Sequence, residues 1–325
     1  MKKFLSLVLA LVMTMSLVTV SAGAKDFTDD SKITYKEAVD VISAVDVVDG
    51  YEDGKFNPQG SLTRGAAAKI ICNMILGPTT ASELHADTAP YKDVPIDHTF
   101  AGYIAYCQKE GIISGYADGT FKPGNTLTGY AFMKMLLGAL GYDAAVENYV
   151  GDNWSVSVAK RALNIGLDDG LVEAFNGIKA VTREEACLYA FNTLQADLVE
   201  YSGTIVVGGV AVTGTDEKAM EWKNSATRID HIKDDEYVQF AEQYFNKLVL
   251  TPGTDAFGRP TREWEFNGKD IGTYVNTDLL VESYSEKVTG KDLYELLGKS
   301  TVDDYDFDIY ICLLYTSPSP RDMRR

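Results

Sequence analysis

The sequence repeats itself, and this repeat constrains the fold more than any other feature. Residues 50–69 and 115–134 are identical at ten of twenty aligned positions, where average composition would give roughly one. A chain that repeats one supersecondary unit buries its apolar faces by packing the units against one another. The fold must therefore be read as an assembly of similar units.

Each unit contains a tight loop. Asp and Gly favour turns because Asp bonds its own backbone and Gly adopts positive φ without steric cost. In both copies a Phe follows this turn, and a Pro two residues later prevents a regular element from continuing. The residues expected to form the two loops are Gly50, Asp53, Gly54, Gly115, Asp118 and Gly119.

An amphipathic helix follows each loop. Apolar residues fall at the fourth, seventh, eighth, eleventh and twelfth positions after Thr63 and after Thr128, which is helical spacing. A third, weaker copy follows Thr182 in the same register. The buried faces are predicted to be Ala67, Ile70, Ile71, Met74 and Ile75; Phe132, Met135, Leu136, Ala139 and Leu140; and Ala186, Tyr189, Ala190, Thr193 and Leu194.

The second copy reads Gly-Ile-Ile-x-Gly-Tyr-x-Asp-Gly-Thr-Phe-x-Pro at residues 111–123, followed by Leu-Thr and the helix. This pattern resembles the S-layer homology (SLH) domain of bacterial surface proteins, and the resemblance covers about residues 27–198. It implies three units in a pseudo-threefold bundle. It also implies that an acidic, ketal-pyruvylated polysaccharide of the cell wall binds in the grooves between units.

The family's Thr-Arg-x-Glu signature is only partly present. The first and third units keep its arginine as Arg64 and Arg183, whereas the second has Gly129. The groove at Thr128-Gly129 is therefore either empty or served by another cation, such as Lys134.

The helix beginnings suggest how an acidic sugar would be held. A helix N-terminus presents free N–H groups and partial positive charge, and an arginine there can bind a carboxylate through two parallel hydrogen bonds. Aromatic rings nearby could stack on sugar faces. The alternatives are a surface ion pair for each arginine and loop packing for the tyrosines. The residues expected to bind polysaccharide are Thr63, Arg64, Thr182, Arg183, Tyr51, Tyr116 and Trp154.

The opening helix of each unit has a weaker signature. Asp29 and Asp93 follow an aromatic residue as in the family's leading Phe-x-Asp, and we expect them to cap these helices. In the third unit the opening helix is expected from Trp154 onward. Residues 77–89 read as a linker between the first two units.

Both ends of the chain are set apart from the fold. Residues 1–24 have basic, apolar and small-residue regions in the order of a signal peptide, with a transmembrane anchor as the alternative. Residues 312–325 resemble a translated sequencing adapter, with a disordered Pro/Ser/Arg tail as the alternative.

Beyond residue 202 the periodicity changes to that of a small α+β segment. A hairpin is predicted around Gly208-Gly209, an amphipathic helix over 234–250, and a strand and turn over 264–268. The predicted fold class is a mainly α N-terminal region of three helix-loop-helix repeats in a pseudo-threefold bundle, followed by this segment. The predicted divisions are 1–24 signal peptide, 25–77, 89–143 and 149–198 SLH repeats, 202–311 α+β segment and 312–325 adapter.

Charge and cysteine content limit the partners. The formal net charge is −17, so the chain as a whole repels nucleic acid, and an anionic ligand must be gripped by locally placed cations. Cys72, Cys107 and Cys187 each lie in an apolar helical pattern, which favours buried thiols over a disulfide framework, with a thiol pair as the alternative. The three histidines lack ligand spacing, so we expect no metal and no cofactor.

Two functions follow from these patterns. The first is a non-catalytic surface protein that is anchored to the cell wall by its repeats, without a membrane span in the mature chain, and that self-associates in a surface layer. The alternative is a wall-anchored polysaccharide-degrading enzyme whose catalytic domain lies outside this chain.

Overall fold

The computed structural model describes residues 18–20, 24–202, 205–207, 210–212, 216–279 and 289. The chain divides into two compact units, and the described α-helices belong to the larger one, Ser21–Leu250 with Trp264–Gly272. Most of the predicted signal peptide and the whole of the predicted adapter lie outside the described residues. Within the described part of the chain, no helix has the length and apolarity needed to cross a membrane.

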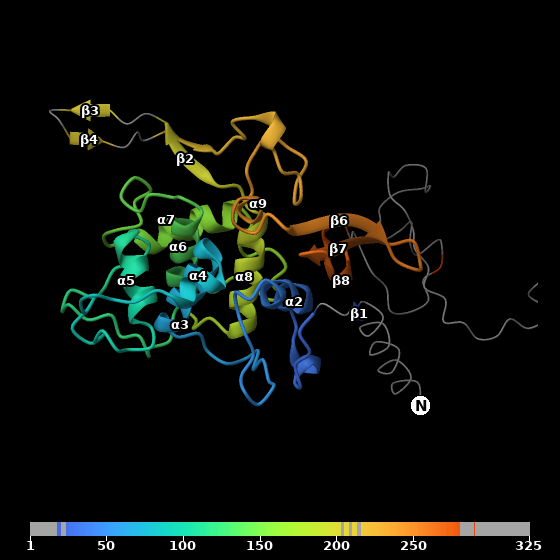
Figure 1. The fold of residues 1–325 in the computed structure, drawn as a ribbon, viewed down its shortest axis with the longest axis horizontal. Helices are drawn as coiled ribbons and strands as arrows, with labels where there is room; N and C mark the ends of the chain where they lie inside the picture. Colours follow the sequence, from blue (N-terminus) through green and yellow to red (C-terminus); the bar gives the residue numbers. More distant parts are fainter. Residues whose placement is uncertain are drawn as a thin grey trace, which may run out of the picture. The chain divides into compact units, whose positions relative to one another are not determined.

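Helices dominate the N-terminal part and strands follow, as predicted (Figure 1). The helical elements, including two short 3₁₀ turns, are η1 Asp30–Lys32, α2 Lys36–Ala44, α3 Arg64–Leu76, α4 Pro78–Ser82, α5 Ala101–Lys109, α6 Gly129–Ala139, α7 Trp154–Asn164, α8 Arg183–Gln195, η2 Ser225–Thr227 and α9 Phe240–Tyr244. A further 3₁₀ turn, η3, covers Thr277–Leu279.

The strands of the described residues form three small sheets. Two are antiparallel pairs, and one has four strands in the order β1-β8-β7-β6. The predicted hairpin is confirmed, because Val207 pairs with Val210. The strands are β1 Val18–Val20, β2 Val199–Ser202, β3 Ile205–Val207, β4 Val210–Val212, β5 Asp216–Ala219, β6 Leu248–Thr254, β7 Pro260–Phe266 and β8 Lys269–Val275.

Helices α3, α6 and α8 begin directly after Thr63, Thr128 and Thr182, where the apolar spacing predicted them. Their predicted faces form the core, with every member buried except Ile75, which is partly exposed. Thr63 and Thr182 cap their helices by accepting hydrogen bonds from Ala66 N and Glu185 N. Thr128 makes no such bond.

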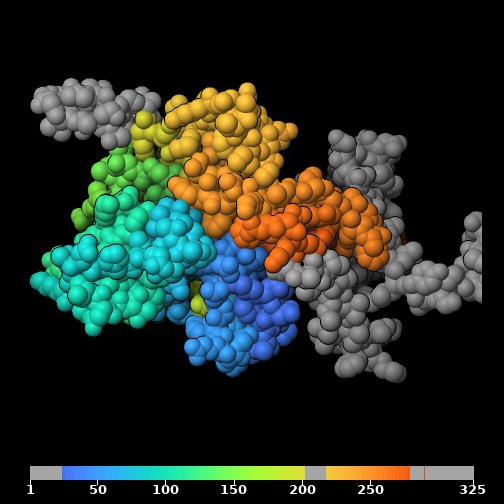
Figure 2. All heavy atoms as spheres, viewed as in Figure 1, coloured from blue at the N-terminus to red at the C-terminus, as the bar shows by residue number. Residues whose placement is uncertain are grey.

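The helices of the three predicted repeats pack in a cyclic order. The second helix of each repeat packs against the first helix of the next: α3 on α5, α6 on α7, and α8 on α2. In the space-filling view, the atoms of the first repeat (blue) and the second (cyan) accordingly lie side by side (Figure 2). No repeat therefore completes its core alone.

Three backbone hydrogen bonds close the same cycle at its centre. Leu62 N donates to Val181 O (2.8 Å), Val181 N to Leu127 O (2.9 Å), and Leu127 N to Leu62 O (2.9 Å). All three leucine and valine side chains are buried. Each extended segment that precedes a main helix thus satisfies its polar backbone on the other two segments.

Two predictions about local structure are wrong. The linker over 77–89 contains helix α4, which starts at Pro78 because Gly77 takes a φ of 73° and proline presets the first helical residue. A helix was predicted over 234–250, but only α9 forms there, and residues from Leu248 onward pair in the β sheet as β6. Tertiary pairing overrides the helical spacing there.

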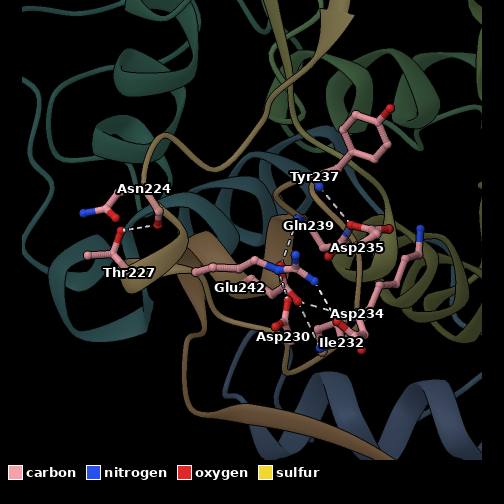
Figure 3. Close-up of polar contacts among 11 residues, drawn as sticks. Asn224, Thr227, Asp230, Ile232, Asp234, Asp235, Tyr237, Gln239 and Glu242 are labelled. Carbon is pink, nitrogen blue, oxygen red and sulfur yellow. Dashed lines mark hydrogen bonds and ion pairs between the residues drawn. The ribbon is translucent and has the colours of Figure 1, made fainter.

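Glu242 fixes the start of α9. Its buried carboxylate accepts hydrogen bonds from the backbone N–H groups of Ile232, Lys233 and Gln239. Figure 3 shows the Glu242 side chain directed at Ile232 and Gln239. The Gln239 side chain in turn donates to Asp197 and Asp235. The segment before α9 is therefore held extended and does not join the helix.

The capping difference among the three main helices gives a prediction. Thr182→Ala should lower the free energy of unfolding by about 1 kcal/mol, because it removes the bond to Glu185 N from a two-way capping box. Thr128→Ala should cost clearly less, since its side chain caps nothing. Urea unfolding of both variants measures the difference, and equal destabilisation would contradict this account of the caps.

Candidate functional site

The two Gly-Tyr-x-Asp-Gly loops have the same backbone geometry. Tyr51 N donates to Lys55 O and Tyr116 N to Thr120 O, both at 2.8 Å. Gly54 and Gly119 have φ values of 79° and 80°, which strain any residue with a side chain. The side chains of Asp53 and Asp118 accept from the backbone two residues on, within each turn. Gly50 and Gly115 have no room for a side chain, because a Cβ would meet Phe27 and Tyr91 at 2.7 and 2.3 Å.

Asp29 and Asp93 hold these loops, and the prediction that they cap the first helices is wrong. Asp29 accepts from Phe56 N (2.8 Å) and Asn57 N (2.9 Å), and no cap bond is made to η1. Asp93 accepts from Phe121 N and Lys122 N, both at 2.7 Å. Asp29 lies 27 residues before Phe56 and Asp93 lies 28 residues before Phe121, and this near-equal spacing was the signal that sequence reasoning missed.

The pKa of each of these two carboxyl groups is lowered. Burial raises the pKa of Asp29 and of Asp93, but the hydrogen bonds from the loop N–H groups outweigh it. Both groups are therefore held as carboxylates, and the loops depend on their charge.

The helix N-termini are not free, contrary to the sequence prediction. The first two N–H groups of α3, α6 and α8 donate to loop carbonyls of the neighbouring repeat, and Thr63 and Thr182 occupy the third. No such terminus offers these groups to an anion. The six bonds, of 2.8–3.1 Å, are Arg64 N to Asn125 O, Gly65 N to Pro123 O, Gly129 N to Lys179 O, Tyr130 N to Gly177 O, Arg183 N to Gly60 O and Glu184 N to Pro58 O.

The two arginine side chains occupy equivalent positions between repeats. Arg64 Nε donates to Phe121 O (2.7 Å) and its Nη2 to Ser114 O (3.4 Å), and the guanidinium lies 5.1 Å from the centre of the Tyr116 ring. Arg183 Nε donates to Phe56 O (2.8 Å) and its Nη2 to Asp49 O (2.7 Å). Its guanidinium lies 4.7 Å from the centre of the Tyr51 ring.

Each arginine is thus fixed by neutral partners. Among the described residues neither guanidinium has a recorded ion pair with a carboxylate, and neither has a recorded bond from Nη1. A guanidinium has five N–H donors, so several remain available for a ligand. Tyr51 and Tyr116 are 52% and 45% exposed beside them. Burial lowers the pKa of Arg64, which still stays charged.

Trp154 and Lys134 are paired with each other. Lys134 Nζ lies 5.4 Å from the centre of the Trp154 indole and donates to Tyr149 O (2.6 Å). The structure therefore groups the site residues as Arg64 with Tyr116 and Arg183 with Tyr51, while Trp154 contacts neither arginine in the recorded interactions of the described residues.

The third inter-repeat position differs in shape and charge. Gly129 stands where the other repeats have arginine, and a Cβ there would meet Gly177 Cα at 3.0 Å. A cavity of about 320 Å³ adjoins it. Three carboxylates and one lysine, itself paired with Glu185, contribute to its lining. These four residues are Glu173, Glu184, Glu185 and Lys179.

Comparison with known proteins agrees with the repeat pattern. A family model described as S-layer homology domain matches residues 26–68 and 90–129. The chain is 26% identical to a cell surface protein of Thermoanaerobacter kivui over 67% of its own length and 28% of that protein. It is 25% identical to a surface layer protein of Brevibacillus choshinensis over 85% of its own length and 24% of that protein.

A shorter match, 34% identical over 24% of the chain and 17% of the relative, is to a cellulosome-anchoring protein of Acetivibrio thermocellus. The chain spans about a quarter of the length of its first relatives. The chain is therefore an SLH-domain-containing protein of the bacterial cell surface, exported to the cell wall. The matched residues stop before the third predicted repeat.

The hydrogen bonds by which Asp29 and Asp93 hold the two loops, here called the aspartate clamps, give a stability prediction. Asp29→Asn and Asp93→Asn should each lower the free energy of unfolding by about 2 kcal/mol, because an amide N–H replaces one of two accepting oxygens and faces a backbone N–H. Asp87→Asn is the matched control, since its side chain is 92% exposed. Urea unfolding measures all three, and a loss no larger than that of Asp87→Asn would argue against the clamps.

The same clamps predict a pH dependence. The folded pKa of both groups lies below the ordinary value of 3.8, so their contribution to stability is complete above that value. It is lost as the pH falls from 3.8 through the lower folded pKa. Unfolding midpoints measured from pH 6 to pH 2 should show a smaller acid-dependent loss in an Asp29→Asn/Asp93→Asn double variant than in the wild type. Parallel curves would contradict the assignment.

Proposed function

We propose that residues 25–77, 89–143 and 149–198 form a pseudo-threefold bundle of SLH repeats that anchors an exported protein non-covalently to cell-wall polysaccharide. The closed cycle of bonds through Leu62, Val181 and Leu127 supports the bundle, as does the cyclic packing of the helices. The anchoring role is supported by the SLH match and by the relative named as a cellulosome-anchoring protein. Self-association in a surface layer is a further proposal, supported by the relatives named as surface layer proteins.

The observation that carries the binding proposal is the state of the two arginines. Arg64 and Arg183 are each fixed across a repeat boundary by carbonyl groups, keep N–H donors unused among the described residues, and lie beside an exposed tyrosine. A fixed guanidinium binds a carboxylate with little further loss of side-chain entropy. The ligand that fits is a sugar carrying a carboxylate, such as a pyruvate ketal.

In this proposal Arg64 and Arg183 pair with the carboxylate, and Tyr116 and Tyr51 contact the sugar ring. Thr63 and Thr182 act indirectly, because their hydroxyl groups cap the helices that carry the arginines. Trp154, which contacts Lys134, stays a proposed sugar contact only outside these two sites. The position at Gly129 supplies no guanidinium, so we assign the acidic sugar to the other two positions.

Net charge shapes the binding conditions. The chain carries −17 overall, so the long-range field opposes an acidic polymer and two local cations must overcome it. Salt screens both effects, but it screens the distant repulsion more than a contact inside a crevice. A non-catalytic anchor is the function that these features support, and they leave residues 202–311 without an assigned role.

The arginine sites give the central prediction. Arg64→Ala and Arg183→Ala should each weaken co-sedimentation of the full chain with purified cell wall by about tenfold, which is the loss of one charge-assisted pair of hydrogen bonds. The double variant should bind about a hundredfold more weakly if the sites are independent. Arg64→Lys/Arg183→Lys should be intermediate, because the charge stays but the planar fork is lost.

The matched control is Arg228→Ala/Lys218→Ala, which removes two positive charges outside the predicted repeats, one on a partly exposed arginine and one on an exposed lysine. Because Arg64 and Arg183 also bridge repeats, urea midpoints must accompany every binding curve. Binding at the wild-type level by a folded Arg64→Ala/Arg183→Ala variant would refute the arginine mechanism. Equal loss in the control pair would show a general charge effect instead.

A further inference from the structure

Two cysteines from different predicted repeats meet in the core. Cys72 lies on α3 and Cys107 on α5, and their Sγ atoms are 3.6 Å apart although the residues are 35 positions apart in sequence. Neither side chain is exposed to solvent. The two helices that carry them pack directly against each other, so the pair lies in the contact between repeats.

The local environment holds both thiols in place. Cys72 Sγ lies 3.5 Å from Tyr103 O, and Cys107 Sγ lies 3.7 Å from Ala68 O. A disulfide bond is about 2.05 Å long, so the sulfur atoms need to approach by roughly 1.5 Å. In the recorded contacts of the described residues, the third buried thiol, Cys187, meets neither sulfur.

In the described part of the chain, Cys72, Cys107 and Cys187 are free and buried, in agreement with the expectation of small buried side chains. An exported protein, however, meets an oxidising environment in which paired cysteines become disulfides. We propose that Cys72 and Cys107 form a disulfide in the exported protein and that this bond cross-links the first SLH repeat to the second. The inference rests on the surface location of the chain and on the geometry, and not on polysaccharide binding.

The bond must form before folding is complete. Thiol–disulfide exchange needs a thiolate that can reach the oxidant. In the folded chain both sulfurs are fully buried, and the hydrogen bond with Cys107 together with burial raises the pKa of the Cys72 thiol. The folded, reduced protein should therefore resist oxidation, whereas the unfolded or folding chain should not.

The chemistry balances with a small disulfide as oxidant. One cysteine, deprotonated, attacks oxidised glutathione and breaks its S–S bond, which releases one glutathione thiolate that takes up the proton. The second cysteine thiolate then attacks the mixed disulfide and releases the second glutathione. Two cysteine thiols are oxidised, one glutathione disulfide is reduced to two thiols, and the cross-link closes the chain segment between the repeats.

The test is a peptide map of the full chain after refolding. The protein is unfolded in urea with reductant and then refolded in either oxidised or reduced glutathione. Free thiols are alkylated in denaturant, and the chain is digested with trypsin without reduction. We expect peptides 70–92 and 93–109 to appear joined after oxidative refolding, to separate on reduction, and to be fully alkylated after reductive refolding. Cys187 should be alkylated throughout. The fourth cysteine of the sequence, Cys312, lies outside the described residues and falls in a separate tryptic peptide.

Two further arms make the test decisive. The same oxidant added to folded, reduced protein should give little cross-link, and the cross-linked protein should unfold at a higher urea concentration than the reduced one. Cys72→Ala should abolish both the joined peptides and this redox-dependent shift, whereas Cys187→Ala should keep both. The covalent map remains informative even if a variant folds poorly.

Three results would overturn the inference. The first is alkylation of both cysteines after oxidative refolding and in protein recovered from the cell surface without reduction. The second is a stable glutathione adduct on Cys72 or Cys107 without the joined peptides. The third is a cross-link that instead involves Cys187 or a second chain.

Discussion

The structure depends on an exchange of backbone hydrogen bonds around a closed cycle. Leu62, Leu127 and Val181 each donate to one partner segment and accept from the other, and all three are buried. A buried extended segment must satisfy its N–H and C=O groups, and a single unit has no neighbouring strand with which to do so. Three similar segments solve this together. The helices pack in the same cyclic order, with α3 on α5, α6 on α7 and α8 on α2.

This cycle determines what the helix N-termini can do. In α3, α6 and α8 the first two N–H groups donate to carbonyls of the adjacent loop, so these groups link the predicted repeats and are not available to a ligand. The third N–H is also occupied in α3 and α8, by Thr63 and Thr182. Recognition of an anion then falls to side chains. Arg64 and Arg183 extend from those same helix beginnings, and their bonds to loop carbonyls fix them at the repeat boundaries. Assembly and the proposed binding thus use neighbouring atoms of the same residues.

Local features were predictable from the sequence, and features that depend on a neighbouring repeat were not. The starts of α3, α6 and α8 after Thr63, Thr128 and Thr182 follow from apolar spacing within a dozen residues, and the pairing of Val207 with Val210 follows from the two glycines between them in the sequence. The occupied helix N-termini, by contrast, need carbonyls from another repeat. The prediction of a helix over 234–250 was wrong for a related reason, because the C-terminal residues of that span pair as β6 with β7, a strand later in the chain.

Gly129 occupies the position after Thr128 that corresponds to Arg64 after Thr63 and Arg183 after Thr182. Its backbone N–H still donates to Lys179 O, so the exchange between repeats is intact without the arginine. The space beside Gly129 is narrow, because a Cβ there would lie 3.0 Å from Gly177 Cα. A cavity lined in part by Glu173, Glu184 and Glu185 adjoins the position. The backbone hydrogen bonds between segments therefore do not depend on the arginine side chain that is proposed to bind the anion. A repeat can lose its cation, and with it the proposed affinity for an acidic sugar, while it continues to hold its two neighbours in place.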